Sequence, residues 1–277
     1  AVKIVGAGLI GTSIGLALAQ QGVSITIEDA DEKALALARD LLAPYIKASG
    51  GEKKEFDLVV IATPPASVIG ALKSEFVINP KSVFIDVSSV KTNLIHEIEV
   101  LPALSQSFVG THPMAGREVS GASSAQADLF NGRAWIITPT SNSSERAIAI
   151  AKQLIKALGA SSYEMNAKDH DHLMARISHL PQIASTLIAS EIQELGAGFE
   201  LSGQGLRDMT RIAGSDPLLW SEILLENKNE VINTLDQFIS RALALKGAIS
   251  DSKQDEIEAI FKKGNSGRAK VSGKHGA

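Results

Sequence analysis

The fold of this chain is decided by residues 1–11, which read AVKIVGAGLIG. The apolar run 1–5 predicts a strand, and the next six residues match the pattern G-x-G-x-x-G. A helix is expected from Thr12 to Gln21, where apolar residues recur with helical spacing before Gly22. The glycine pattern alone is a weak signal, but its position between a strand and a helix is typical of a dinucleotide-binding unit.

Each glycine of this pattern has its own physical role in such a unit. Gly6 permits the tight turn, Gly8 lets the backbone approach a pyrophosphate, and Gly11 lets the helix pack closely on the strand. The free N–H groups at the start of the helix then face the phosphates. The sequence therefore predicts a cofactor loop that includes Leu9 and Ile10. The alternative is a glycine turn that holds no ligand.

A carboxylate follows the second expected strand, residues 24–28. Asp29 lies 18 positions after Gly11, where a carboxylate can accept hydrogen bonds from ribose hydroxyls. Its negative charge would repel a 2′-phosphate, so NAD is favoured over NADP as the cofactor. Glu28 takes this role instead if the strand ends one residue earlier.

The rest of the N-terminal half alternates strands with helices. Residues 34–42 predict a helix, and apolar runs typical of strands buried on both faces follow it. These runs are 58–62, 83–87, 108–109 and 134–137. The alternation predicts a parallel sheet covered by helices on both faces, with its ligand beyond the carboxyl ends of the strands.

Two of these strand ends carry polar side chains. Thr63 and Pro64 leave the third strand abruptly, and Thr63 is expected to face the nicotinamide ribose. Ser88, Ser89 and Lys91 leave the fourth strand. The two serines are candidate cofactor contacts, with capping of the next helix as the alternative for one of them. For Lys91 we expect a solvated position in the first turn of that helix, with a cofactor or substrate contact as the alternative.

The segment 110–116, GTHPMAG, places a histidine at the edge of the expected crevice. Pro113 disfavours a helical conformation at His112, and the flanking glycines free the backbone. We therefore expect His112 on an irregular turn, where an imidazole can move a proton near neutral pH. Ser89, at the same sheet edge, could hydrogen-bond this imidazole and hold its tautomer. The alternative is an ordinary polar loop histidine.

Past Tyr163 the strand-like runs disappear. Helices are expected at 166–177, 181–195, 217–227 and 230–249. The chain is therefore predicted to divide into an α/β domain at 1–164, a helical domain at 165–264 and a disordered basic tail at 265–277.

Three further polar features lie in the helical half. Residues 169–172 read DHDH, but helical neighbours two apart do not share a face, so we expect the polar start of a helix and no metal site. Pro181 is expected to break the helical run and place His179 at a kink. Arg211 is suited to bidentate recognition of a carboxylate, with Glu118 as a possible partner. The alternative for Arg211 is an ordinary salt bridge.

The bulk composition excludes several classes of protein. The chain has 277 residues, a net charge of −4, 44% hydrophobic residues and no cysteine. Disulfide scaffolds and thiolate chemistry are therefore excluded, and the charge does not suggest binding to nucleic acid or to a membrane surface. No apolar run is long enough to span a bilayer and no signal-peptide pattern precedes the first strand. We expect a cytoplasmic protein.

Taken together, the motifs resemble the prephenate/arogenate dehydrogenase family of tyrosine biosynthesis. The similarity covers roughly residues 1–250 and depends on the order of several motifs rather than on one of them. The residues that carry it are 6–11, 86–91, 110–116, 178–181 and 210–217. The resemblance implies an α/β Rossmann-type dinucleotide-binding domain followed by an all-α dimerisation domain. It also implies a homodimer that uses NAD to decarboxylate prephenate to 4-hydroxyphenylpyruvate, or arogenate to tyrosine.

The resemblance also implies roles for single residues. His112 would accept the proton of the ring hydroxyl, with Ser89 orienting it near the nicotinamide. Arg211 would bind a substrate carboxylate, and Glu118 would lie at the mouth of the pocket, while His179 belongs to the matching helical motif.

Two substrate-binding candidates depart from the family pattern. Gln182 stands where the family often has a second histidine, and Arg117 stands where threonine is common.

Two other functions remain open from the sequence. A hydroxyacid dehydrogenase resembling 6-phosphogluconate dehydrogenase would share the two-domain plan but needs a lysine base, for which Lys168 is the candidate. A dinucleotide-binding dimer without turnover would bind NAD and catalyse nothing.

Overall fold

The computed structural model describes residues 1–45, 55–116, 121–194 and 197–272. By its internal contacts the chain forms two compact units, Ala1–Lys228 and Asn229–Ala277. The sheet and the helices that immediately follow it therefore belong to one unit. The domain boundaries drawn from the sequence, at 164 and 264, stay predictions.

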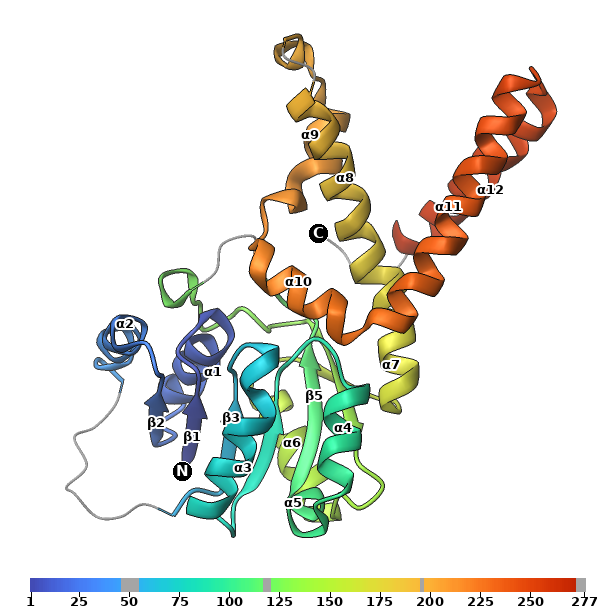
Figure 1. Cartoon of the computed structure of the whole chain (residues 1–277). Helices are drawn as coiled ribbons and strands as arrows, with labels where there is room; N and C mark the ends of the chain where they lie inside the picture. The colour runs from blue at the N-terminus through green and yellow to red at the C-terminus, as the bar shows by residue number, and fades with distance from the viewer. Residues whose placement is uncertain (46–54, 117–120, 195–196, 273–277) are drawn as a thin grey trace. The chain divides into compact units, whose positions relative to one another are not determined.

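Within the described ranges the strands form one seven-stranded sheet of order β2-β1-β3-β4-β5-β6-β7 (Figure 1). The strands are β1 Val2–Val5, β2 Ile25–Glu28, β3 Leu58–Ile61, β4 Val83–Asp86, β5 Phe108–Pro113, β6 Ala134–Pro139 and β7 Ser161–Glu164. From β2 to β5 neighbouring strands are parallel, which confirms the predicted α/β fold.

The far edge of the sheet differs from the sequence-based prediction. β6 runs antiparallel to β5, and β7 pairs parallel with β6. No crossover α-helix separates β5 from β6 among the described residues, and such a helix is the usual connection between parallel neighbours. β7 was not predicted, because its four residues are all exposed and form no apolar run.

The helices of the first unit include those that cover the sheet and a run of helices that follows it. They are α1 Leu9–Gln20, α2 Glu32–Leu42, α3 Val68–Ile78, α4 Thr92–Glu99, α5 Pro102–Ser107, α6 Glu145–Ala157, α7 Ala167–Met174, α8 Leu180–Glu194, α9 Gln204–Thr210 and α10 Pro217–Glu226. Short 3-10 turns at Pro65–Ser67, Ala122–Ser124, Phe199–Leu201 and Arg211–Gly214 link some of them.

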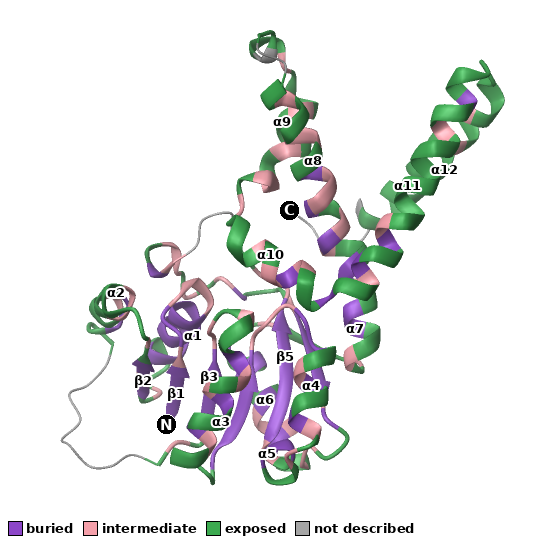
Figure 2. Cartoon of the chain, viewed as in Figure 1, coloured by how far each residue is buried: buried purple, intermediate pink, exposed green. Residues whose placement is uncertain are grey.

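β3 explains why the predicted strands are continuously apolar. Leu58 and Val60 pack into the core on the face covered by α1 and α6, while Val59 and Ile61 pack into a second core under α3 and α4. Side chains of a strand alternate between faces, so a strand covered on both faces must be apolar throughout. Figure 2 shows the buried residues concentrated in these strands.

The second unit contains the remainder of α11, Lys228–Ser250, and α12, Gln254–Ser272. The tail predicted to be disordered from residue 265 is helical through Ser272, and the rest of it lies outside the described residues. Acidic Asp255 and Glu256 occupy the first turn of α12, and Lys262 pairs with Glu258 one turn away at 2.7 Å. Both features favour a helix. No helix among the described residues has the length and apolarity needed to cross a membrane.

Candidate active site

The glycine loop lies where the chain switches direction in the sheet, between the carboxyl ends of β1 and β3. Gly6 has φ +113, and a Cβ there would lie 2.4 Å from the Ala62 carbonyl oxygen. A Cβ on Gly11 would lie 2.0 Å from the Gly6 carbonyl oxygen, whereas one on Gly8 would meet nothing within 4 Å. Packing therefore requires glycine at 6 and 11, while Gly8 borders open space at the switch point, where ligands of such sheets bind.

The start of α1 is built to receive an anion. Gly8 is its N-cap residue, and among the described residues no side chain caps it and no acidic residue lies in its first turn. Within the described ranges, the backbone N–H groups of Leu9, Ile10 and Gly11 have no side-chain acceptor. Uncapped N–H groups at a helix start are a ready site for phosphates.

Asp29 lies directly beside this loop. Its Oδ2 accepts a hydrogen bond from the Ala7 N–H at 2.6 Å, and its Oδ1 accepts one from Asp31 N–H at 2.8 Å. Glu28 instead forms an ion pair with Lys3 at 2.9 Å. Of the two carboxylates considered for the ribose, Asp29 is therefore the one placed at the loop.

Thr63 and Pro64 follow β3 on the other side of the switch point. The Thr63 Oγ1 is buried and has no hydrogen-bond partner within the described part of the chain. A buried hydroxyl without a partner is rare in a folded protein. Together with the open loop at Gly8, this hydroxyl fits a bound dinucleotide that would supply the missing partner.

A buried charge cluster joins the ends of β4 and β5. The Lys91 ammonium contacts Asp86 Oδ2 and donates to Ser88 Oγ at 2.9 Å, and the side chains of Lys91 and Asp86 are fully buried. Asp86 also accepts from the Thr111 N–H at 3.1 Å. Burial lowers the pKa of Lys91, an effect that the Asp86 carboxylate opposes. The solvated position predicted for Lys91 is wrong, because its ammonium neutralises a carboxylate beneath the strand ends.

His112 lies in β5, not on the irregular turn that the sequence suggested. The strand continues through Pro113, and His112 pairs with Ile136 of β6. Its imidazole is buried, and Nδ1 lies 2.9 Å from His170 Nε2. Burial, followed by the nearby His170 and Lys91, holds the pKa of His112 well below its usual value. The imidazole is therefore neutral at pH 7.

His170 and Asp171 are site residues that the sequence analysis missed. The His170 Nδ1 lies 2.7 Å from Asp171 Oδ1. Asp171 also accepts from the backbone N–H groups of Lys91 at 2.9 Å and Thr92 at 2.7 Å, so it caps α4 from a distant helix. The start of α4 carried the available signal: its N-cap residue, Lys91, provides no side-chain cap.

Ser88 and Ser89 stay predicted cofactor contacts, but the hydrogen bond expected between Ser89 and His112 is not found among the described residues. The Ser88 hydroxyl donates to Asp86 and accepts from Lys91, so it belongs to the charge cluster. In the part of the chain that the structure describes, no hydrogen bond joins Ser89 to His112, and His170 occupies the imidazole Nδ1 instead. Ser89 is half-buried at the same strand end.

The helical run does not break at Pro181. α7 and α8 are joined by a π-helical stretch, Ala175–His179, which accommodates the missing N–H of the proline without ending the helix. His179 is buried at the end of this stretch, and its Nδ1 lies 3.2 Å from Asn227 Nδ2. Burial lowers the pKa of His179 to about 4.

Two of the remaining substrate-binding candidates, Arg211 and Gln182, lie on and near the turn after α9. Arg211 is exposed at the start of this 3-10 turn. The Gln182 amide is buried and donates to the Ile212 carbonyl at 2.9 Å, so it is bound to the turn that carries Arg211. Arg117 and Glu118 lie outside the described residues.

Comparison with known proteins identifies the family. The model of the prephenate dehydrogenase nucleotide-binding domain matches residues 14–164, and that of the prephenate dehydrogenase dimerization domain matches residues 166–263. The chain belongs to the prephenate dehydrogenase family. Its members are oxidoreductases, so the resemblance found in the motifs, the two-part fold and the enzyme class are confirmed.

Curated relatives can be aligned with most of this chain. A probable prephenate dehydrogenase of Streptomyces niveus is 34% identical over 87% of the chain, and a prephenate dehydrogenase of Bacillus subtilis is 31% identical over 94%. The chain spans 66% and 72% of those two proteins. A cyclohexadienyl dehydrogenase of Zymomonas mobilis is 30% identical, with 99% of this chain and 97% of that protein covered.

A solved relative has the same fold over the whole chain. The prephenate dehydrogenase of A. aeolicus, in complex with hydroxyphenyl propionate and NAD+, superposes with a TM-score of 0.86 at 27% identity over 98% of each chain. An arogenate dehydrogenase from Synechocystis shares the fold, with a TM-score of 0.77 at 24% identity over 98% of this chain and 99% of that one.

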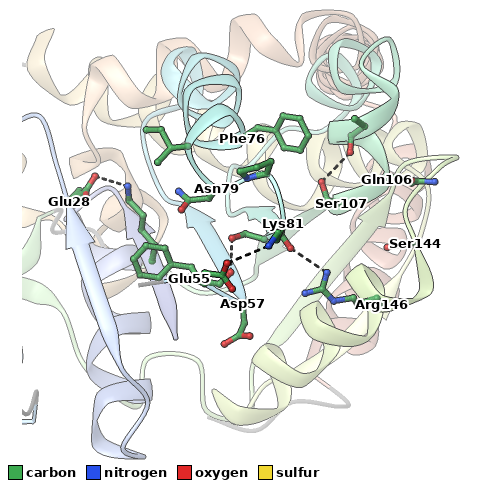
Figure 3. Close-up of a pocket in the computed structure, with 16 residues that line it drawn as sticks. Glu28, Glu55, Asp57, Phe76, Asn79, Lys81, Gln106, Ser107, Ser144 and Arg146 are labelled. Carbon is green, nitrogen blue, oxygen red and sulfur yellow. Dashed lines mark hydrogen bonds and ion pairs between the residues drawn. The ribbon is translucent and has the colours of Figure 1, made fainter. Parts of the chain in front are cut away.

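A cavity elsewhere in the first unit is lined by none of the predicted cofactor- or substrate-binding residues except Glu28. It has a volume of about 1180 Å³ and lies by the residues that precede β3 and β4, such as Asp57 and Ser82. Figure 3 shows its charged lining, in which Lys81 faces Glu55 and Arg146 donates to the Lys81 carbonyl. The glycine loop and His112 lie instead at the carboxyl ends of the strands.

Proposed function

We propose that this chain catalyses the NAD-dependent oxidative decarboxylation of prephenate to 4-hydroxyphenylpyruvate, of arogenate to tyrosine, or of both. The observation that carries this proposal is a neutral, buried imidazole, His112, at the carboxyl end of a sheet whose glycine loop is open to a dinucleotide. Relatives named prephenate dehydrogenase and cyclohexadienyl dehydrogenase support the substrate class.

In this mechanism His112 is the general base. It takes the proton of the ring hydroxyl while the hydrogen on the same carbon leaves as hydride, and bound NAD supplies the acceptor for that hydride. The C–O bond becomes a carbonyl, the carboxylate on the opposite ring carbon leaves as CO2, and its electron pair makes the ring aromatic. His112 then returns its proton to the phenolate oxygen. A positioned base of this kind contributes about 10²–10⁴ to the rate.

The cofactor is held at the switch point of the sheet in this proposal. The N–H groups at the start of α1 bind the pyrophosphate, and Asp29 accepts hydrogen bonds from the adenosine ribose. Thr63 provides a buried hydroxyl without a partner among the described residues, and Pro64 and Ser89 border the nicotinamide. The Asp29 charge favours NAD over NADP.

The substrate is held from the helical side. Arg211 pairs with a substrate carboxylate, and His179 lies in the same buried network as His112. Gln182 acts through the turn that carries Arg211, while Arg117 and Glu118 stay predicted rim residues. We further propose a homodimer formed through the dimerisation domain, in the cytoplasm.

The alternative base receives no support from the structure. Lys168 is exposed on α7. A dehydrogenase that needs a buried lysine base at this position is therefore disfavoured relative to one that uses His112.

One assay tests the proposal. Purified protein is mixed with NAD and either prephenate or arogenate, and the absorbance of reduced nicotinamide is followed. We expect turnover with at least one substrate and a loss of at least about 10²-fold in kcat for His112→Asn. Tight NAD binding without turnover of either substrate would contradict the proposal, and an active His112→Asn variant would remove the imidazole from the mechanism.

A further inference from the structure

The chain of hydrogen bonds behind His112 begins at a carboxylate whose charge state is well defined. Asp171 accepts from the backbone N–H groups of Lys91 and Thr92, and its Oδ1 forms a hydrogen bond with the His170 Nδ1. Burial alone would raise its pKa, but these hydrogen bonds hold the pKa below its usual value. The two backbone donors form the N-terminus of α4, which also favours negative charge. Asp171 is therefore ionised and acts only as an acceptor.

An ionised Asp171 fixes the proton on His170. Because the carboxylate can only accept, the His170 Nδ1 at 2.7 Å must donate to it. Burial lowers the pKa of His170, so its ring is neutral at pH 7 and carries one proton. That proton is on Nδ1, and the His170 Nε2 must therefore act as an acceptor.

The same reasoning applies to His112, the proposed base. The His112 Nδ1 lies 2.9 Å from the His170 Nε2. Since His170 offers a lone pair there, His112 must donate from Nδ1. The neutral His112 ring then has its own lone pair on Nε2, the nitrogen that is free to take a proton.

We propose that Asp171 and His170 are positioning residues that lock His112 in the Nδ1–H tautomer and so direct Nε2 to act as the base. This inference rests on the proposed function for its kinetic consequences, but the position of the proton follows from the hydrogen bonds alone. Neither residue touches the reacting atoms in this scheme, because both act through the His112 ring.

The groups around His112 also bear on the proton that it accepts. Lys91 and the imidazoles of His170 and His179 disfavour an imidazolium at this position. The carboxylates Asp86 and Asp171 are the opposing charges. The hydrogen bond to His170 conveys the Asp171 charge to the His112 ring, so the dyad supports the transient imidazolium as well as the tautomer.

The first test measures proton positions by ¹⁵N NMR of histidine-labelled full-length protein at pH 7.5. We expect the His112 Nδ1 to show the shift and one-bond coupling of a protonated ring nitrogen, and Nε2 those of a bare one. A proton on the His112 Nε2 in the wild-type protein would overturn the proposal. This measurement needs no substrate, so it remains decisive even if neither prephenate nor arogenate is turned over.

The second test separates positioning from structure by kinetics. His170→Leu should lower kcat about 10²-fold or more with an unchanged KM for NAD, and it should release the His112 tautomer in the NMR spectrum. His170→Gln should restore part of kcat, because its amide oxygen accepts from His112 while its NH₂ group donates to Asp171. His172→Leu is the matched control, since His172 is an exposed histidine on the same helix.

Two kinetic outcomes would contradict the proposal. One is wild-type kcat in His170→Leu. The other is an equal loss in His170→Leu and His172→Leu, which would indicate damage to α7 rather than loss of the relay. If His170→Leu does not fold, the wild-type NMR spectrum and the His170→Gln variant still decide the matter.

Discussion

Acidification should destabilise this protein through its buried histidines, and His179 allows the size of the effect to be worked out. Burial lowers the pKa of His179 to about 4 in the folded protein, against a usual value near 6.5 in the unfolded chain. Between these two values the unfolded state binds the extra proton and the folded state does not. The contribution of His179 to the free energy of unfolding therefore falls as the pH drops from about 7 towards 4, and this contribution is constant above that range.

The expected magnitude follows from the distance to the unfolded pKa. pH 5 lies about 1.5 units below the pKa of the unfolded histidine, and each unit corresponds to about 1.4 kcal/mol. His179 alone therefore lowers the free energy of unfolding at pH 5 by about 2 kcal/mol relative to pH 8. His112 and His170 also have lowered pKa values and act in the same direction. Their contributions add to that of His179 in the wild-type protein.

A difference between two proteins isolates the contribution of His179. Urea unfolding of the wild type and of His179→Gln is measured at pH 8 and pH 5, at one fixed protein concentration. The variant should lose about 2 kcal/mol less than the wild type on acidification, because its side chain does not titrate. His96→Gln is the control, since His96 is exposed, and it should behave as the wild type. Equal acid sensitivity in His179→Gln and the wild type would refute the reasoning.

Three further predictions concern the cofactor loop and the charge cluster. Gly11→Ala forces a Cβ to within 2.0 Å of a backbone oxygen and should lower the free energy of unfolding by about 3 kcal/mol. Gly8→Ala should leave the melting temperature nearly unchanged but weaken NAD binding measured by calorimetry. The reverse pattern would contradict the roles given to these two glycines. Asp29→Ser should raise the ratio of kcat/KM for NADP over NAD, and an unchanged ratio would remove Asp29 from cofactor selection. Lys91→Met leaves the fully buried Asp86 carboxylate without its cation, so it should lower the free energy of unfolding by about 3–5 kcal/mol in urea titrations. A variant as stable as the wild type would show that the ion pair does not contribute to stability.

The sequence predicts well the features that depend on residues close together in the chain. The apolar run at β3 predicts a strand buried on both faces because each of its residues must face one of two cores. The glycine loop is equally local, since Gly6, Gly8 and Gly11 act within one turn and the next strand end. The direction of β6 does not depend on neighbouring residues alone, because it is set by how the chain returns from β5. The predicted parallel arrangement is wrong there.

The polar network is what the sequence could not provide. His112 and His170 are 58 residues apart, and Asp171 and Lys91 are 80 apart, so no spacing rule brings them together. The run 169–172 looked like an exposed helix start because each side chain was judged against its own helix. In the structure two of these residues, His170 and Asp171, are buried against β5 and the start of α4. Burial of a polar side chain depends on its distant partner, which local patterns do not contain.

The charges of this network explain how a buried imidazole can accept a proton at all. Around His112 lie two carboxylates, Asp86 and Asp171, and one ammonium, that of Lys91. With the three histidines neutral, these groups leave the cluster with one negative charge. Burial keeps His112 unprotonated at rest, so it is ready to act as a base. When it takes the hydroxyl proton, the whole cluster becomes neutral, which limits the cost of forming the imidazolium in the low-dielectric interior.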